Sequence, residues 1–174
     1  MKTRTLALCA TLSALGVVIL SVGALIDTID LTVACVTSLI CVFAVIELGL
    51  RAAVSIWLVT GLLAFILLPA KFPAVEYIVY AGIYPILKYL IESRIKSRSV
   101  QIAAKGGYYA AVLVLLYFAS KLFAAEAETG ALLALTAVTA LAAFSIFDVL
   151  LTRLITLYRL KWRDRLRIDR FIKK

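Results

Sequence analysis

One stretch of the sequence repeats ionisable and aromatic side chains at a constant spacing. Glu76, Tyr80, Tyr84 and Lys88 recur at every fourth residue, and Tyr77 follows the first of them. Side chains four residues apart lie on one slowly rotating stripe of a helix. Tyrosine rings stack on organic molecules, and their hydroxyl groups and a nearby carboxylate can orient such a ligand. The stripe therefore predicts a substrate-binding surface formed by Glu76, Tyr77, Tyr80 and Tyr84.

These residues also have a simpler interpretation. Tyrosines concentrate where a membrane meets water, and a proline such as Pro85 can kink a helix for packing alone. For Tyr80 and Tyr84 both interpretations stay open. For Glu76, a side chain that simply faces water is the preferred interpretation.

A second acidic feature is the short turn Asp27-Thr28-Ile29-Asp30, which separates two apolar segments. Carboxylates attract cationic ligands, so Asp27 and Asp30 are further candidate substrate-binding residues. Alternatively, the turn is acidic because basic residues are excluded from the outer face of a membrane. Two carboxylates without converging ligands do not indicate a calcium site.

Two side chains of opposite charge are predicted to lie at a similar depth. Asp148 is about one turn from the end of the last apolar segment, and Lys88 is near the same end of the fourth. An isolated charge within hydrocarbon costs about 2.5–3.5 kcal/mol on insertion scales, so we expect a buried ion pair between Lys88 and Asp148. The alternative is that Lys88 extends to the interface and Asp148 pairs with nearby arginines.

The usual catalytic constellations are absent from the sequence. There is no Gly-rich loop ending in Gly-Lys-Ser/Thr, no His-Glu-x-x-His pair, no Gly-x-Ser-x-Gly turn and no histidine. Cys9, Cys35 and Cys41 fall within apolar segments, where cysteine behaves as a small apolar residue. We therefore expect no enzyme activity, no cofactor and no metal site.

The elements that position these residues are predicted to be transmembrane helices. The 174 residues are 64% hydrophobic, with a mean hydropathy of +1.07, and about 20 apolar residues cross a bilayer. Residues 31–68 in one helix would be roughly 57 Å long, so the chain must fold back within residues 47–51. Pro69 and Pro73 mark the next boundary. The expected fold is all-α, a polytopic membrane helix bundle with six spans at residues 6–26, 31–50, 52–68, 74–91, 107–123 and 131–152.

Basic residues lie almost entirely on one face of this arrangement. Every Lys and Arg except Lys71 and Lys121 falls on the side that holds both termini, which the positive-inside rule assigns to the cytoplasm. We expect a multi-pass cell-membrane protein with cytoplasmic N- and C-termini. Residues 1–152 would form the six-helix transmembrane domain and residues 153–174 a basic amphipathic cytoplasmic tail.

The positions of the basic residues also indicate their partner. They adjoin the ends of membrane segments and do not form a separate basic domain, which favours anionic lipid headgroups and disfavours nucleic acid. The longest connection between spans, residues 92–106, is polar with occasional apolar residues. It is expected to lie along the cytoplasmic interface.

A pair of small residues marks the first span. Ala10 and Ala14 are one helical turn apart, and small side chains allow another helix to approach closely. With its size, six expected spans and basic N-terminal start, the chain resembles the substrate-binding S components of energy-coupling factor (ECF) transporters of bacteria. The resemblance implies that Ala10 and Ala14 dock on a transmembrane T component, that separate ATPase subunits supply energy, and that the chain captures a vitamin or other micronutrient.

A second function remains open beside this one. The chain also resembles, in its number of spans, the small membrane component of bacterial rod-shape assemblies, which implies a scaffold with protein partners and no small-molecule substrate. A sealed apolar interior around Tyr80 and Tyr84 would favour the scaffold, whereas an outward cavity lined by them would favour capture.

Overall fold

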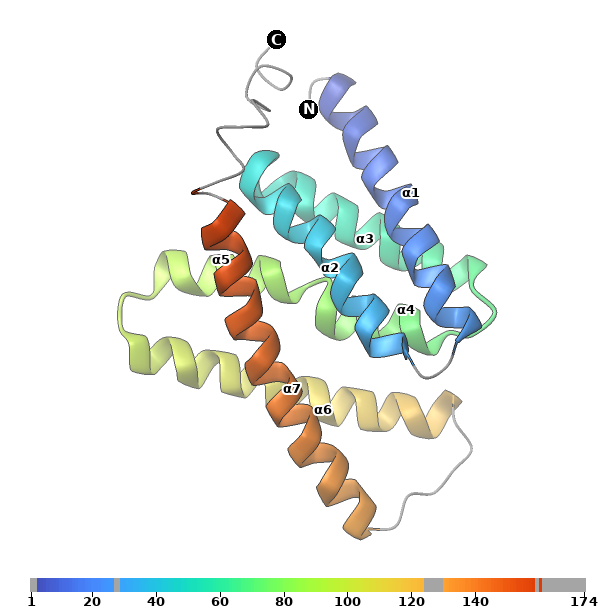
Figure 1. Ribbon diagram of the computed structural model, residues 1–174, viewed down its shortest axis with the longest axis vertical. Helices are drawn as coiled ribbons and strands as arrows, with labels where there is room; N and C mark the ends of the chain where they lie inside the picture. The colour runs from blue at the N-terminus through green and yellow to red at the C-terminus, as the bar shows by residue number, and fades with distance from the viewer. Residues whose placement is uncertain (1–2, 27–28, 124–129, 159, 161–174) are drawn as a thin grey trace. The chain divides into compact units, whose positions relative to one another are not determined.

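The computed structural model describes residues 3–26, 29–123, 130–158 and 160, and every regular element within these ranges is helical (Figure 1). The chain divides into two compact units, Met1–Ala125 and Glu126–Lys174. The helices of the first unit are α1 (Thr3–Leu25), α2 (Asp30–Glu47), α3 (Leu50–Leu67), α4 (Phe72–Glu76), the π-helical turn η2 (Tyr77–Ala81), α5 (Tyr84–Arg94) and α6 (Arg98–Phe123). The second unit contains α7 (Gly130–Leu157).

The first unit is a packed bundle. Helix α1 packs against both α2 and α3, and α2 also contacts α4, η2 and α5. Helix α6 contacts α4, η2 and α5, and Figure 1 shows α5 and α6 as a hairpin. The segment that contains η2 is therefore surrounded by helices from both ends of the unit.

The surface and interior of this unit are those of a protein that lies in lipid. Large apolar side chains such as Val18, Leu62 and Ile66 are exposed, whereas Ser13 and Thr60 are buried, and a water-soluble protein shows the reverse trend. Five described segments are long and apolar enough to cross a membrane: Thr3–Leu25, Asp30–Glu47, Leu50–Leu67, Phe72–Arg94 and Val138–Leu157. The chain thus has the helices of a multi-pass membrane protein, and the expected crossing at residues 107–123, within α6, stays a prediction.

Both expected boundaries among the first four spans are confirmed. Helix α2 ends at Glu47 and α3 begins at Leu50. Between them, Gly49 adopts a φ of +88°, a left-handed conformation that glycine reaches without steric cost. Helix α3 ends at Leu67, and the next helix begins at Phe72 with Pro73 in its first turn, where proline's missing N–H group is not needed.

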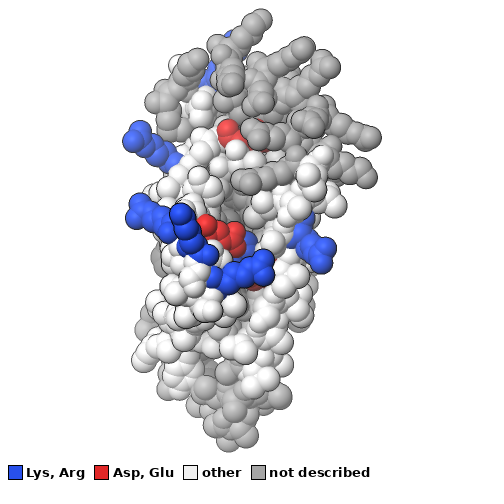
Figure 2. Space-filling model, turned by 90° about the vertical axis from the view of Figure 1, so that its left-hand side faces the viewer, with Lys and Arg blue, Asp and Glu red and all other residues white. Residues whose placement is uncertain are grey.

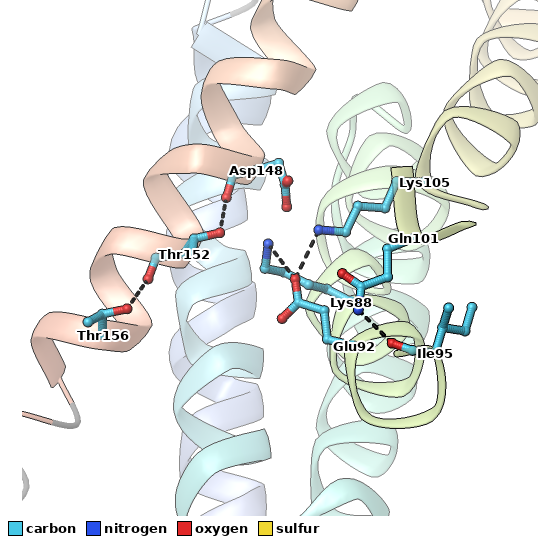
Figure 3. Close-up of polar contacts among 8 residues, drawn as sticks. All are labelled: Lys88, Glu92, Ile95, Gln101, Lys105, Asp148, Thr152 and Thr156. Carbon is cyan, nitrogen blue, oxygen red and sulfur yellow. Dashed lines mark hydrogen bonds and ion pairs between the residues drawn. The ribbon is translucent and has the colours of Figure 1, made fainter. Parts of the chain in front are cut away.

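The expected polar connection at residues 92–106 is wrong. Helix α5 continues to Arg94 and α6 begins at Arg98, so only residues 95–97 join them. The polar side chains that suggested a loop contact one another across the hairpin. Gln101 Nε2 donates a hydrogen bond to the carbonyl of Ile95 at 2.6 Å, and Lys105 Nζ lies 2.9 Å from Glu92 Oε1 (Figure 3).

The packing around η2 leaves no room for a side chain at Gly82. A Cβ atom there would lie 2.7 Å from both Trp57 Cδ1 and Tyr77 Cζ, whereas at Gly106 it would meet nothing within 4 Å. We expect Gly82→Ala to lower the free energy of unfolding by about 1–3 kcal/mol, as overpacked cores do. Gly106→Ala, within α6, should instead raise it by about 0.5–1 kcal/mol. Thermal unfolding in detergent micelles measures both, and equal effects would contradict the packing described here.

Candidate functional site

The fourth membrane segment, Phe72–Arg94, is interrupted at its centre. The expectation of one continuous helix over residues 74–91 is wrong, because the N–H of Gly82 bonds to the carbonyl of Tyr77, five residues back, at 2.7 Å. This wide turn precedes Pro85, which lies in the first turn of α5, so the interruption does not begin at the proline. Single π-turns within helices occur frequently at functional sites.

Side chains from two other helices hold the interruption in place. Trp57 Nε1 on α3 donates to the carbonyl of Ile78 at 3.1 Å. The hydroxyl of Tyr108 on α6 donates to the carbonyls of Val79 and Tyr80 at 2.7 and 3.3 Å. Within hydrocarbon, backbone groups released from a regular helix must find such partners. The wide turn is therefore a built feature of the bundle.

Tyr77 and Tyr84, two of the candidate substrate-binding residues, are fully buried in packing contacts. The hydroxyl of Tyr77 lies 3.2 Å from Cys41 Sγ on α2. The ring of Tyr84 stacks on that of Tyr108, with centroids 5.9 Å apart and planes inclined by 22°. These contacts give both tyrosines a structural role, and a ligand-binding role for either stays a prediction.

Glu76 and Asp30 are brought together. The interpretation of Glu76 as a hydrated side chain is wrong, because its relative exposure is 7% and its Oε2 atom has no hydrogen-bond partner among the residues described. Asp30, in the first turn of α2, is close enough to interact electrostatically with Glu76. Asp27, its predicted companion, lies outside the described residues. Two candidate acids from separate segments thus converge inside the bundle.

Aromatic groups line the same region. Tyr80, 5% exposed, interacts electrostatically with Glu76 and with Tyr109 of α6, which is 4% exposed. We call Asp30, Glu76, Tyr80 and Tyr109 the carboxylate–tyrosine cluster. The sequence analysis missed Tyr109 and Tyr108. The available signal was a pair of tyrosines at the start of an otherwise apolar segment, but neither belongs to a repeating pattern.

The cluster can bind but has little that could catalyse. It offers carboxylate oxygens as acceptors, phenolic hydroxyl groups as donors or acceptors, and aromatic faces. Within the described ranges, His, Cys, Asp and Glu side chains do not gather in a group of three or more that could hold a metal ion. The arrangement therefore suits noncovalent recognition of a polar organic molecule.

Lys88, at the other end of the interrupted segment, has a partner that the sequence analysis did not assign. Its side chain is 2% exposed, and its Nζ atom lies 3.2 Å from Glu92 Oε1, which Lys105 also contacts (Figure 3). On α7, Thr152 Oγ1 donates to the backbone carbonyl of Asp148 at 2.8 Å. Because Lys88 and Asp148 belong to different compact units, their expected ion pair stays a prediction.

Helix α1 has distinct inner and outer faces. Ser13 and Gly16 are buried, and a Cβ atom at Gly16 would lie 2.7 Å from Thr60 Cγ2 on α3. Ala10 and Ala14 are exposed on the other face. The two residues expected to dock on a partner helix are thus open to one.

Comparisons with protein-family models, with curated proteins and with solved structures gave no match. The function is therefore argued from the chain's own residues.

Proposed function

We propose that this protein is the membrane-embedded substrate-capture subunit of a multi-subunit importer, of the ECF S-component type and without ATPase activity of its own. The observation that carries the proposal is the burial of Glu76. Its side chain is within a membrane segment, one carboxylate oxygen lacks a hydrogen-bond partner among the described residues, and Asp30 is nearby. Ionisable groups within membranes are expensive, and where they occur they mark substrate or ion sites by default.

The interrupted helix supports the same function. In membrane transporters, substrate sites are commonly built at discontinuous helices, where irregular backbone is tolerated because it is surrounded by protein or lines a cavity. Here the π-helical turn immediately follows Glu76 and includes Tyr80. Substrate would bind at the carboxylate–tyrosine cluster, toward the outer side in the proposed topology.

The proposed topology has six spans and both termini in the cytoplasm. It places the α5–α6 hairpin at the cytoplasmic side, with anionic lipid headgroups as its neighbours. On the face seen in Figure 2, blue Lys and Arg side chains gather beside a red acidic patch, and the white surface below them shows no charged side chain. One-sided charge of this kind supports the orientation. A T component would dock on the exposed face of α1 at Ala10 and Ala14, and ATPase subunits would join through it.

One observation favours a scaffold instead. The complete burial of Tyr77 and Tyr84 is the sealed interior that a non-transport scaffold would have. The burial of Glu76 argues against it, because a protein that only packs helices gains nothing from a carboxylate in its core.

Purification in mild detergent, followed by solvent extraction and mass spectrometry, separates the two functions. We expect about one molecule of a small organic compound per chain, because a capture subunit with micromolar or tighter affinity retains its substrate during purification. A membrane protein of similar size, purified in the same way, is the control. A folded helical sample with no compound above that control would contradict capture and favour the scaffold.

A further inference from the structure

We infer that the molecule captured at the carboxylate–tyrosine cluster is an organic cation that carries an ammonium or amidinium group. This inference rests on the proposed capture function and specifies the chemical class of its substrate. Its basis is the convergence of Asp30 and Glu76 beside tyrosine rings in the interior of the first unit.

Charge is the first argument. Two carboxylates that interact inside a low-dielectric bundle repel each other when both are ionised. A cation placed between them removes this repulsion and supplies hydrogen-bond donors to Glu76 Oε2, which has no partner among the described residues. A carboxylate accepts charge-assisted hydrogen bonds from ammonium or amidinium groups, which are about twice as strong as neutral ones. An anionic substrate would add a third negative charge to the same region.

The aromatic residues indicate an organic cation and disfavour a bare metal ion. Tyr80 and Tyr109 present ring faces near the carboxylates, and a cation over such a ring is attracted by its quadrupole. Their rings also contact the apolar part of an organic molecule. Divalent metals need more oxygen ligands than two carboxylates supply, and the described residues contain no group of three or more acidic, Cys or His side chains.

Space at the cluster comes partly from α1. A Cβ atom at Gly23 would lie 3.5 Å from Asp30 Oδ1 and 3.3 Å from Val33 Cβ, so the backbone of α1 approaches the Asp30 carboxylate closely. The cluster is thus bounded by α1, α2, the interrupted segment and α6. Four elements that converge on one acidic centre are the expected construction for a small-molecule site between helices.

Benzylammonium and benzyl alcohol are suitable probes, because they share a ring and a similar size and differ in charge. At about 10 mM, benzylammonium should raise the thermal unfolding midpoint of the purified, substrate-depleted protein by about 4 °C, whereas benzyl alcohol should not. Glu76→Gln should abolish the benzylammonium shift. Glu47→Gln makes the same chemical change at the end of α2 and should leave the shift intact.

Each other outcome overturns the inference. Equal shifts from both probes, a shift from the alcohol alone, or no shift from either would exclude a preference for organic cations. Persistence of the shift in Glu76→Gln would place the cation elsewhere. If Glu76→Gln does not fold, the comparison of the two probes on the wild-type protein decides. Capture itself is decided separately: a neutral or anionic compound recovered by solvent extraction overturns only the cation, whereas recovery of no compound overturns capture.

Discussion

Replacing Lys88 with methionine is expected to destabilise the folded protein by about 3–5 kcal/mol, which is the cost of leaving a buried charge without its partner. The partner in question is Asp148. Lys88 is 2% exposed and shares Glu92 with Lys105, so these three side chains together carry a net positive charge that a further carboxylate would balance. Asp148→Asn should have a similar cost, because it leaves the positive charge in excess.

The double variant is the decisive measurement. If Lys88 and Asp148 pair, Lys88→Met combined with Asp148→Asn removes both charges together and should restore most of the stability and membrane accumulation lost in each single variant. Glu92→Gln is the control, because Glu92 is 41% exposed and exposed ion pairs contribute about 0–1 kcal/mol. Mild single effects that simply add in the double variant would show that the two residues do not interact.

The second large effect is expected on assembly. Ala10→Trp combined with Ala14→Trp should reduce co-purification of a T component and its ATPase subunits by at least about 100-fold, equivalent to about 3 kcal/mol of binding free energy. Both alanines are exposed on α1, and two indole rings would prevent the close helix approach that small residues allow. The inner face of α1 is untouched, so the protein itself should remain folded.

Leu8 and Leu15 provide the matched control. Both are exposed on α1, at 40% and 51%, and a helix turns by about 100° per residue, which places them roughly 120° around from Ala10 and Ala14. Leu8→Trp combined with Leu15→Trp should leave assembly unchanged. Equal loss with both double variants, or full retention of the T component with tryptophan at 10 and 14, would reject this docking face.

Much of the bundle was predictable because its signals are local. Apolar runs of about 20 residues define spans without any knowledge of tertiary packing, and Gly49, Pro69 and Pro73 mark turns through their own backbone limits. The α5–α6 hairpin was not predictable in this way. Glu92 and Lys105 are polar enough to suggest a loop, and only their contact across the hairpin makes helix favourable there.

The site was predictable only in part. The four-residue spacing from Glu76 to Lys88 correctly marked buried side chains, but it assumed a regular helix. In such a helix Lys88 would stand about 120° around from Glu76. The π-helical turn takes up about one extra residue, which reduces that rotation to about 20° and keeps both ends of the stripe inside the bundle. The partners that hold this turn, Trp57 and Tyr108, are distant in sequence and carry no pattern that could have identified them.

The wide turn after Glu76 also determines how the chain tolerates a change in length. Removing one residue from 77–81 would convert the turn to a regular helix and rotate everything that follows by about 100° relative to what precedes it. Lys88 would then point toward lipid while Glu76 kept its place. A related chain with a regular fourth helix would therefore align with this one only across a one-residue gap, positioned between the outer acidic end of the segment and its inner basic end.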